Sequence, residues 1–483
     1  MSYLVTIGLE VHAQVKTQTK MFCACRTSFG DTPNTHNCPV CLGLPGALPV
    51  LNQAAIEKTL LTGLMLGCGS PEISKWDRKN YFYPDMPKNY QTTQMDLPLC
   101  IGGGVPLYEH CYPTDVRKNI AKPGKIVRLN RIHLEEDVAK STHLGNSSLI
   151  DFNRAGTPLM EIVTEPDLES GEEAFAYLRS LQMILQQGDV ADADMEKGQL
   201  RCDVNISLRK NEADPLGSKV ELKNLNSISA IRRAIHFEIH RQTEELDRGI
   251  PQIQSTRRWD DDRGETQLMR TKEDAHDYRY FSCPDLLPIE TAPLLAKVRP
   301  LVPELPHELA QRFENELGVT AYDASVLSSD KNLATYFEAV TDPQIPGKKV
   351  ANFIINNLLG TLNEHGIDIH ACPVAPAKLR ALLQLVENGT LAANQAKEVF
   401  TVLFDAPENE PSAIADSLGF KPAEAGELEG LVEQAIANNP NEVAAIQAGN
   451  EKLLNFLTGQ VMKSAATKPN PKQVTDLLRA RLL

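Results

Sequence analysis

Four cysteines gather in a short segment near the N-terminus. Cys23, Cys25, Cys38 and Cys41 follow the pattern C-x-C and then C-P-x-C. Two closely spaced pairs of thiolates can complete the tetrahedral coordination of a structural Zn²⁺. Free thiols, or a site that has lost its metal, are the alternative, because C-x-C is less typical of zinc sites than C-x-x-C. We expect zinc to pin the loop 23–41.

Four other segments alternate apolar and polar side chains with the period of two that is typical of β-strands. Their polar members include carboxylates, imidazoles, amides, guanidinium groups and two lysines: Glu10 and His12, then Arg131, His133 and Glu135, then Arg201, Asp203 and Asn205, and finally Lys219, Glu221 and Lys223. A solvated sheet face would explain any one segment. Four together favour Mg²⁺ on the oxygen ligands and phosphate on the basic groups. We predict a metal and nucleotide site on one face of a sheet.

The phosphate-binding loops of common nucleotide enzymes are missing from the sequence. It contains no GxxxxGK[ST] motif, and the glycine run 102–104 is short and isolated. We interpret this run as a hairpin turn. If ATP binds, metal ions and basic side chains on the sheet must hold its phosphates.

The composition is that of an ordinary folded protein. The 483 residues are 42% hydrophobic and 23% charged, and the formal net charge is −14. This charge argues against a surface that binds nucleic acid or membranes non-specifically. The N-terminus lacks the regions of a signal peptide, and ten cysteines are too few for a secreted disulfide scaffold. We expect a cytoplasmic protein.

The sequence patterns divide the chain into three parts. Residues 1–292 combine strand-like alternation with a few helices, one of which starts after Ser170, and predict an α+β domain with a largely antiparallel sheet. Apolar residues at helical spacing predominate in 293–405. A linker rich in acids and prolines opens the remaining part, 406–483, which is again helical. We predict an α+β domain, an all-α domain and a small helical tail.

The end of the tail is basic, unlike the rest of the chain. Between Val461 and Leu483 there is one acidic residue, Asp476, against five basic ones: Lys463, Lys468, Lys472, Arg479 and Arg481. A helix starting at Asn470-Pro471 would carry the last three of these basic residues, Lys472, Arg479 and Arg481. A solvated helix end explains such cations, and binding to RNA phosphates is the alternative.

Long stretches of the sequence resemble the B subunits of bacterial glutamyl/aspartyl-tRNA amidotransferases. The resemblance spans the chain and includes the two cysteine pairs. The other matching stretches are GLEVHAQ from Gly8, RKNYFYPDMPKNYQ from Arg78, RIHLEED from Arg131, DFNRAGTPLMEIVTEPD from Asp151, LRCDVNISLR from Leu200, VELKNLNS from Val220 and AHDYRYF from Ala275. It implies a cradle domain similar to glutamine synthetase, which would bind ATP on an open sheet.

The resemblance also implies a reaction, that of a glutamine-hydrolysing carbon–nitrogen ligase. ATP with Mg²⁺ would phosphorylate the side-chain carboxylate of Glu-tRNA(Gln) or Asp-tRNA(Asn), and ammonia would displace the phosphate to give the amide. An amidase A subunit would release the ammonia from glutamine, and a small C subunit would complete the complex. The basic residues of the tail would then contact the misacylated tRNA.

Roles for individual residues follow from the same resemblance. Mg²⁺ would be held by Glu10, His12, Glu135 and Glu221, with Asp203 and Asn205 in the same cleft. ATP would be contacted by Arg201 and by an aromatic loop that closes over the substrate and excludes water: Lys79, Tyr81, Tyr83, Asp85 and Lys88. Simple turn packing is the alternative for that loop.

Two other functions remain open. A stand-alone ATP-dependent ligase that amidates a small carboxylic acid would explain the polar sheet, but not the basic tail or the cysteines. A non-catalytic RNA-binding scaffold would explain the tail. ATP hydrolysis with and without charged tRNA separates the three.

Overall fold

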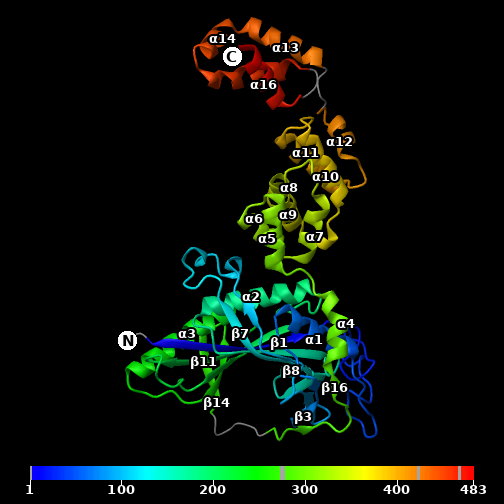
Figure 1. Cartoon of the computed structure of the whole chain (residues 1–483), viewed down its shortest axis with the longest axis vertical. Coiled ribbons are helices and arrows are strands. Elements are labelled where there is room, and N and C mark those ends of the chain that lie inside the picture. Colours follow the sequence, from blue (N-terminus) through cyan, green and yellow to red (C-terminus); the bar gives the residue numbers. More distant parts are fainter. Residues whose placement is uncertain (1–2, 272–277, 421–424, 466–468, 483) are drawn as a thin grey trace. The chain divides into compact units, whose positions relative to one another are not determined.

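The computed structural model describes residues 3–271, 278–420, 425–465 and 469–482 (Figure 1). They form two compact units, Met1–Pro306 and His307–Leu483, and each is described by itself. No helix among these residues has the length and apolar character needed to cross a bilayer.

The first unit is built around a sheet that has nine strands in the described part of the chain, in the order β14-β13-β12-β11-β1-β10-β7-β5, with β6 also paired to β7. Every pair is antiparallel except β12 with β13. This confirms the predicted α+β class with a largely antiparallel sheet. The strands are β1 (Leu4–Gln14), β5 (Cys100–Ile101), β6 (Gly104–Pro106), β7 (Ile126–Glu136), β10 (Pro158–Thr164), β11 (Leu200–Arg209), β12 (Val220–Lys223), β13 (Ser255–Asp260) and β14 (Glu265–Thr271).

Helices α2 and α3 cover one face of this sheet, and a small sheet that contains β3 lies on the other side (Figure 1). The small sheet has the order β15-β3-β4, and two further two-stranded sheets pair β16 with β2 and β8 with β9. The remaining elements of the unit are β2 (Ile73–Ser74), β3 (Asp77–Asn80), β4 (Tyr90–Thr93), β8 (Lys140–Leu144), β9 (Ser147–Asp151), β15 (Phe281–Ser282), β16 (Ile289–Glu290), α1 (Gln53–Met65), α2 (Gly171–Gln187), α3 (Ile228–Asp247), α4 (Thr291–Val298), η1 (Glu109–Cys111), η2 (Arg117–Asn119) and η4 (Arg299–Leu301).

Alternation of side chains sets which face of each strand is buried. In β1, Ile7, Leu9, Val11 and Ala13 are at most 1% exposed, whereas the residues between them are partly exposed. The buried side joins the helices in one apolar core. The polar side faces away from that core, as the sequence predicts.

Two local predictions for the first unit have opposite outcomes. The helix predicted after Ser170 is confirmed, because the Ser170 side chain caps α2 by accepting from the Glu173 N–H at 3.2 Å. The hairpin predicted at 102–104 is wrong, since β5 and β6 both run along β7 in one direction. Gly102 and Gly103 instead form a kink in positive φ, where a Cβ on Gly103 would lie 2.5 Å from the Leu66 carbonyl oxygen.

The second unit is helical, as predicted. Its described α-helices are α5 (Pro306–Leu317), α6 (Ala321–Leu327), α7 (Lys331–Val340), α8 (Gly347–Phe353), α9 (Leu359–His365), α10 (Pro376–Glu387), α11 (Ala393–Asp405), α12 (Pro411–Ser417), α13 (Ala425–Asn438), α14 (Pro440–Gln447), α15 (Leu454–Ser464) and α16 (Pro471–Leu482), and shorter helical turns are η5 (Ile354–Leu358), η6 (Ile369–Ala371) and η7 (Glu451–Leu453).

The described residues of this unit form two separate apolar cores. One contains Phe313, Phe337 and Phe400, and the other contains Leu457 and Leu478 of the tail. The helix predicted to start at Asn470-Pro471 is confirmed as α16, with the Asn470 Oδ1 accepting from a backbone N–H of the first turn at 3.0 Å. The division of the chain into 1–292, 293–405 and 406–483 stays a prediction.

Candidate active site

Strand register aligns polar residues from neighbouring strands on the face of the sheet that the large helices leave open. Glu10 of β1 pairs in register with Asp203 of β11. Two residues later, His12 pairs with Arg201 on one side and with Glu161 of β10 on the other. Because side chains opposite one another lie within about 5.5 Å, this register is enough to bring ligand atoms together.

The first cluster consists of three carboxylates. Glu10, Asp203 and Glu221 each place one oxygen so that the three atoms lie within 4.8 Å of one another. Asn205 Nδ2 donates to Glu10 Oε1 at 2.8 Å and holds that carboxylate in place. Lys223 forms ion pairs with Asp203 and, at 3.1 Å, with Glu221. One ammonium group does not neutralise three carboxylates, so the cluster suits a divalent cation.

Lys223 and the carboxylates of this cluster favour one another's charged forms. Burial opposes the charge on Lys223, but the Asp203 and Glu221 carboxylates outweigh it and raise the pKa of Lys223. Burial likewise opposes the charge on Glu221, and Lys223 together with the Thr256 hydroxyl holds the pKa of Glu221 below its usual value. Thr256 Oγ1 donates to Glu221 Oε2 at 2.8 Å. The carboxylate of Glu221 is therefore ionised and oriented at neutral pH.

The second cluster combines one imidazole with two carboxylates. Ligand atoms of His12, Glu135 and Glu161 lie within 4.8 Å of one another. His12 Nε2 is 3.5 Å from Glu161 Oε2 and 3.9 Å from Glu135 Oε1. His133 Nε2 lies 3.0 Å from the same Glu161 oxygen. Glu135 is 3% exposed, and the Thr93 hydroxyl of the small sheet donates to its Oε2 at 3.4 Å.

The pKa values of the two carboxylates of the second cluster are shifted in opposite directions. Burial, followed by the neighbouring Glu161 charge, raises the pKa of Glu135. Burial acts in the same sense on Glu161, but His133 and His12 outweigh it and hold the pKa of Glu161 well below its usual value. Burial would lower the pKa of His12, yet its hydrogen bond with Glu161 raises it. A bound cation would likewise favour the ionised form of both carboxylates.

Two cations border the second cluster. Lys79 of β3 has its Nζ 4.9 Å from the centre of the Tyr278 ring. Burial opposes its charge, but the Glu135 carboxylate raises the pKa of Lys79. Arg201 Nη2 donates to Asp137 Oδ1 at 2.8 Å. Both side chains can offer N–H donors to a phosphate near the carboxylates.

Asp137 anchors Arg201, and Asp137→Asn should destabilise the first unit. Asp137 is 1% exposed and also contacts Gln14 Nε2 at 3.0 Å and Arg154 Nε at 3.7 Å. The amide leaves the guanidinium groups of Arg201 and Arg154 without their anion, which should lower the free energy of unfolding by about 3 kcal/mol. We expect urea denaturation at pH 7 to show this loss.

The matched control for this variant is Asp96→Asn. Asp96 pairs with Lys75 at 2.7 Å but its side chain is 61% exposed, so loss of its charge should lower the free energy of unfolding by less than about 1 kcal/mol.

The contribution of Asp137 to stability depends on pH. Although burial alone would raise the pKa of Asp137, Arg201 and Arg154 hold this pKa below the ordinary value. Its stabilising contribution is thus present above about pH 4 and is lost as pH falls through the folded-state pKa. Equal losses in the two variants would contradict this assignment.

Of the residues predicted for the aromatic loop, Lys79 belongs to β3, and the others lie between β3 and β4. Tyr81 and Tyr83 stack with their ring centres 5.6 Å apart. Burial raises the pKa of Tyr81 to about 12 and also raises that of Asp85. Lys88 forms a buried ion pair with Glu136. Lys88 is therefore engaged by a carboxylate, whereas Tyr83 is largely exposed.

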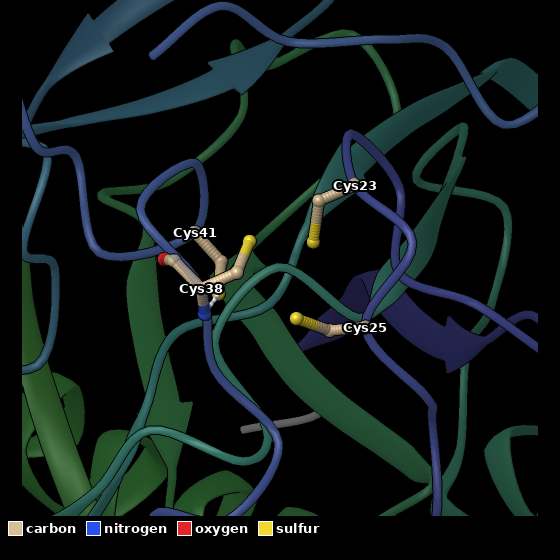
Figure 2. A group of neighbouring side chains, drawn as sticks. All are labelled: Cys23, Cys25, Cys38 and Cys41. Atoms are coloured by element: carbon tan, nitrogen blue, oxygen red, sulfur yellow. Dashed lines mark hydrogen bonds between the residues drawn. The ribbon is translucent and has the colours of Figure 1, made fainter.

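The four predicted zinc ligands come together. Figure 2 shows the thiols of Cys23 and Cys25 pointing toward those of Cys38 and Cys41 from two segments of one loop. All four sulfur atoms lie within 4.8 Å of one another, and those of Cys38 and Cys41 are 3.9 Å apart. Tetrahedral zinc thiolates place their sulfur atoms about 3.8 Å apart. The cluster matches the size of a four-coordinate metal site.

A fully buried lysine supports this cluster. Lys20 Nζ lies 3.6 Å from Cys41 Sγ and donates to the backbone oxygens of His36 at 2.7 Å and Phe152 at 3.1 Å. A hydrogen bond from Cys23 lowers the pKa of Cys41 to about 5. Thiolate, the form that binds metal, is therefore favoured at Cys41.

The structure divides the four predicted magnesium ligands between the two clusters. Glu10 and Glu221 join Asp203 in the first, and His12 and Glu135 belong to the second. Sequence reasoning did not single out Glu161, although it alternates with buried neighbours in β10 and lies in one of the motif stretches. It also assigned no role to Lys223 or Asp137, although alternation placed Lys223 on a polar strand face and the stretches VELKNLNS and RIHLEED contain the two residues.

The basic tail residues differ in their surroundings. Lys463 and Lys472 are exposed, and no acidic partner is found for either within the described residues. Arg479 Nη2 is 3.4 Å from Glu451, and Arg481 pairs with Glu433 at 3.3 Å and with another glutamate of α13. Lys468 lies outside the described residues.

Comparison with known proteins relates both units to one family. Residues 5–296 match the model of the GatB/GatE catalytic domain, and residues 335–482 match that of the GatB domain. The chain is similar to the B subunit of the aspartyl/glutamyl-tRNA(Asn/Gln) amidotransferase of Methylacidiphilum infernorum, with 50% identity over 100% of this chain and 99% of the relative. The corresponding B subunits of Persephonella marina and Moorella thermoacetica are 47% and 44% identical, each over 100% of both chains. The chain therefore belongs to the family of aspartyl/glutamyl-tRNA(Asn/Gln) amidotransferase B subunits.

Proposed function

We propose that this chain is the B subunit of an amidotransferase that converts Glu-tRNA(Gln), Asp-tRNA(Asn) or both to the amidated forms with ATP and ammonia. The observation that carries the proposal is the pair of clusters able to hold a metal ion on one open sheet face, in a chain that matches B subunits along its whole length. Charged tRNA is used in translation, so we place the reaction in the cytoplasm.

Two divalent cations suit the two clusters, and Mg²⁺ is the one expected with ATP. Glu10, Asp203 and Glu221 would hold one cation, and His12, Glu135 and Glu161 the other. When bound, the cations neutralise phosphate charge during phosphoryl transfer. The oxygen-rich first cluster fits Mg²⁺ by its chemistry, and the imidazole in the second allows a softer metal as well.

The neighbouring side chains would position the reactants. Arg201, fixed by Asp137, and Lys79 would donate to ATP phosphates or to the substrate carboxylate. Asn205 would orient Glu10. The loop with Tyr81, Tyr83 and Asp85 would close over the site, because water would hydrolyse the activated carboxylate. Lys88 could contact ATP only if its ion pair with Glu136 were broken.

The chemistry activates a poor acceptor. A carboxylate has no good leaving group, so transfer of the terminal phosphoryl group of ATP to one of its oxygens comes first. The nitrogen of ammonia then attacks the carbonyl carbon, the bond to the phosphorylated oxygen breaks, and phosphate leaves as the nitrogen loses a proton. We propose that an amidase A subunit supplies the ammonia and that the same complex contains a small C subunit.

We propose a structural zinc ion for the four cysteines. The sulfur spacing and the buried ammonium of Lys20 both support a metal held by thiolates. Its role would be to fold a long segment that has little regular structure between β1 and α1.

The decisive test is ATP turnover by the purified chain with its co-purifying subunits, with and without Glu-tRNA(Gln). Turnover that requires charged tRNA and yields Gln-tRNA(Gln) supports the proposal. Turnover without tRNA that amidates small acids would identify a stand-alone ligase. Absence of phosphoryl transfer under all conditions would leave the RNA-binding scaffold.

Charge reversal in the tail should weaken tRNA binding. We expect Lys463→Glu combined with Lys472→Glu to raise KM for charged tRNA at least about tenfold. The slope of log K for tRNA binding against log salt concentration should also fall by roughly two, because each lysine that contacts a phosphate releases about one counterion. Both lysines are exposed, so folding should be unaffected. Lys397→Glu, an exposed change in α11, is the control, and an equal KM in the double variant and the wild type would exclude this role.

A further inference from the structure

A separate cavity lies on the helix-covered side of the sheet. Its volume is about 550 Å³, and it is lined by the segment of η1 and η2, by α2 and by the start of α3. Figure 1 shows this cyan segment beside α2, on the side opposite β3. None of the residues proposed for catalysis lines it. Such a volume is typical of sites for small organic ligands.

The cavity contains an excess of positive charge. Three arginines line it, namely Arg117, Arg179 and Arg232, with Asp115 as the only carboxylate among the lining residues. Arg232 is neutralised, since its Nη2 lies 2.8 Å from Asp115 and 3.0 Å from Glu172. The positive charges of Arg117 and Arg179 therefore remain, in a chain with a formal net charge of −14.

The remaining two guanidinium groups keep donors available. Arg117 donates from Nε to the Tyr112 carbonyl oxygen at 2.8 Å, and Arg179 donates from Nη1 to Gln182 at 2.8 Å. Neither forms an ion pair with any residue that the structure describes. Each leaves other N–H groups, in the fork geometry that binds phosphate through two bonds.

The N-terminus of α3 adds backbone donors. This helix has 20 residues, and the Ser227 side chain caps it by accepting from the Ala230 N–H at 3.0 Å. Ile228 and Ser229 also line the cavity. Their N–H groups have no intrahelical acceptor, and the helix dipole favours an anion at this end.

Buried polar groups in the cavity wall lack partners. Tyr112 is 4% exposed, and its hydroxyl has no hydrogen-bond partner among the described residues; the same holds for His110 Nε2. Burial, and then the charges of Arg117 and Arg179, lower the pKa of His110 to about 4. A neutral imidazole can donate one hydrogen bond. Unpaired buried groups of this kind are costly unless water or a ligand satisfies them.

We propose that this cavity binds a phosphate ester, with Arg117, Arg179 and the first turn of α3 as donors to the phosphate. Two guanidinium groups without an ion pair to a described residue match a phosphate better than a carboxylate. The volume exceeds that of phosphate alone, and Phe175 offers an aromatic wall for the organic part. A free nucleotide and a phosphate of the tRNA backbone share this chemistry.

The test is hydrogen exchange of the full-length chain with its co-purifying subunits. The probes are inorganic phosphate, AMP and uncharged tRNA, each titrated separately. We expect a probe to protect backbone amides in 109–119 and 228–232. Arg117→Gln and Arg179→Gln should each raise at least about tenfold the probe concentration needed for that protection, because each variant loses one charge-assisted hydrogen bond to the phosphate. Arg233→Gln is the matched control, since Arg233 pairs with Asp261 and does not line the cavity.

The outcomes separate the two sources of phosphate. Protection by phosphate or AMP identifies a small-molecule site, and protection by tRNA alone identifies a backbone contact. Either result supports the proposal if both glutamine variants lose protection while melting like Arg233→Gln. Absence of local protection with all three probes, or equal protection in Arg117→Gln and the wild type, would overturn it.

Discussion

Glu135→Gln should lower tRNA-dependent ATP turnover about a thousandfold. The substitution keeps the size of the side chain but removes one charged ligand oxygen, beside His12 and Glu161, from the second cluster. Loss of one metal contact that acts in phosphoryl transfer costs several kcal/mol, and about 4 kcal/mol corresponds to that factor. Turnover is measured in the assembled complex over a range of Mg²⁺ concentrations, where we also expect a higher requirement for the ion.

Three controls make this result specific. The variant should fold normally, because burial already raises the pKa of Glu135 and a neutral side chain suits its position. The glutaminase activity of the partner should be unchanged. Glu165→Gln, which alters a carboxylate bonded to Asn130 at 2.9 Å and outside both clusters, should retain full turnover. Full activity in Glu135→Gln would remove Glu135 from the metal site.

Cys38→Ser should remove the metal from the cysteine cluster and destabilise the first unit. Metal analysis of the purified wild type should find one zinc per chain, and the variant should contain little. The free energy of unfolding should fall by several kcal/mol, because binding of a structural zinc contributes about 10 kcal/mol or more in small domains. Thermal unfolding with and without a chelator measures the difference.

Cys372→Ser is the corresponding control in the second unit. Its thiol donates to the Val374 carbonyl oxygen at 3.4 Å and is not part of any metal-binding group in the described residues. Metal content and response to chelator should match the wild type. If Cys38→Ser also keeps its metal, or if the wild type contains none, the zinc assignment fails.

Much of the first unit was predictable because side-chain direction along a strand is a local property. Alternation alone identified β1, β7, β11 and β12 and their polar faces. Helical spacing and caps located α2 and α16 for the same reason. The kink at Gly102 was missed, because a glycine pair has the same local signature in a turn between strands and in a bend within one edge.

The division of the site into two clusters was not predictable from local patterns. It depends on strand order, since β10 lies between β1 and β7 and brings Glu161 next to His12. The buried pair of Lys88 with Glu136 likewise joins residues 48 positions apart. Lys88 has the sequence context of a phosphate ligand, and only the tertiary contact reveals its carboxylate partner.

Parallel pairing of β12 with β13 makes the first cluster depend on a late folding event. Antiparallel neighbours such as β13 and β14 can pair through a short turn, but a parallel pair requires a crossover, which here contains α3. Thr256, which orients Glu221, follows it by 35 residues. Non-local contacts of this kind form slowly. During synthesis, we expect the emerging chain to acquire its full affinity for a divalent ion at this cluster only after β13 has left the ribosome and docked.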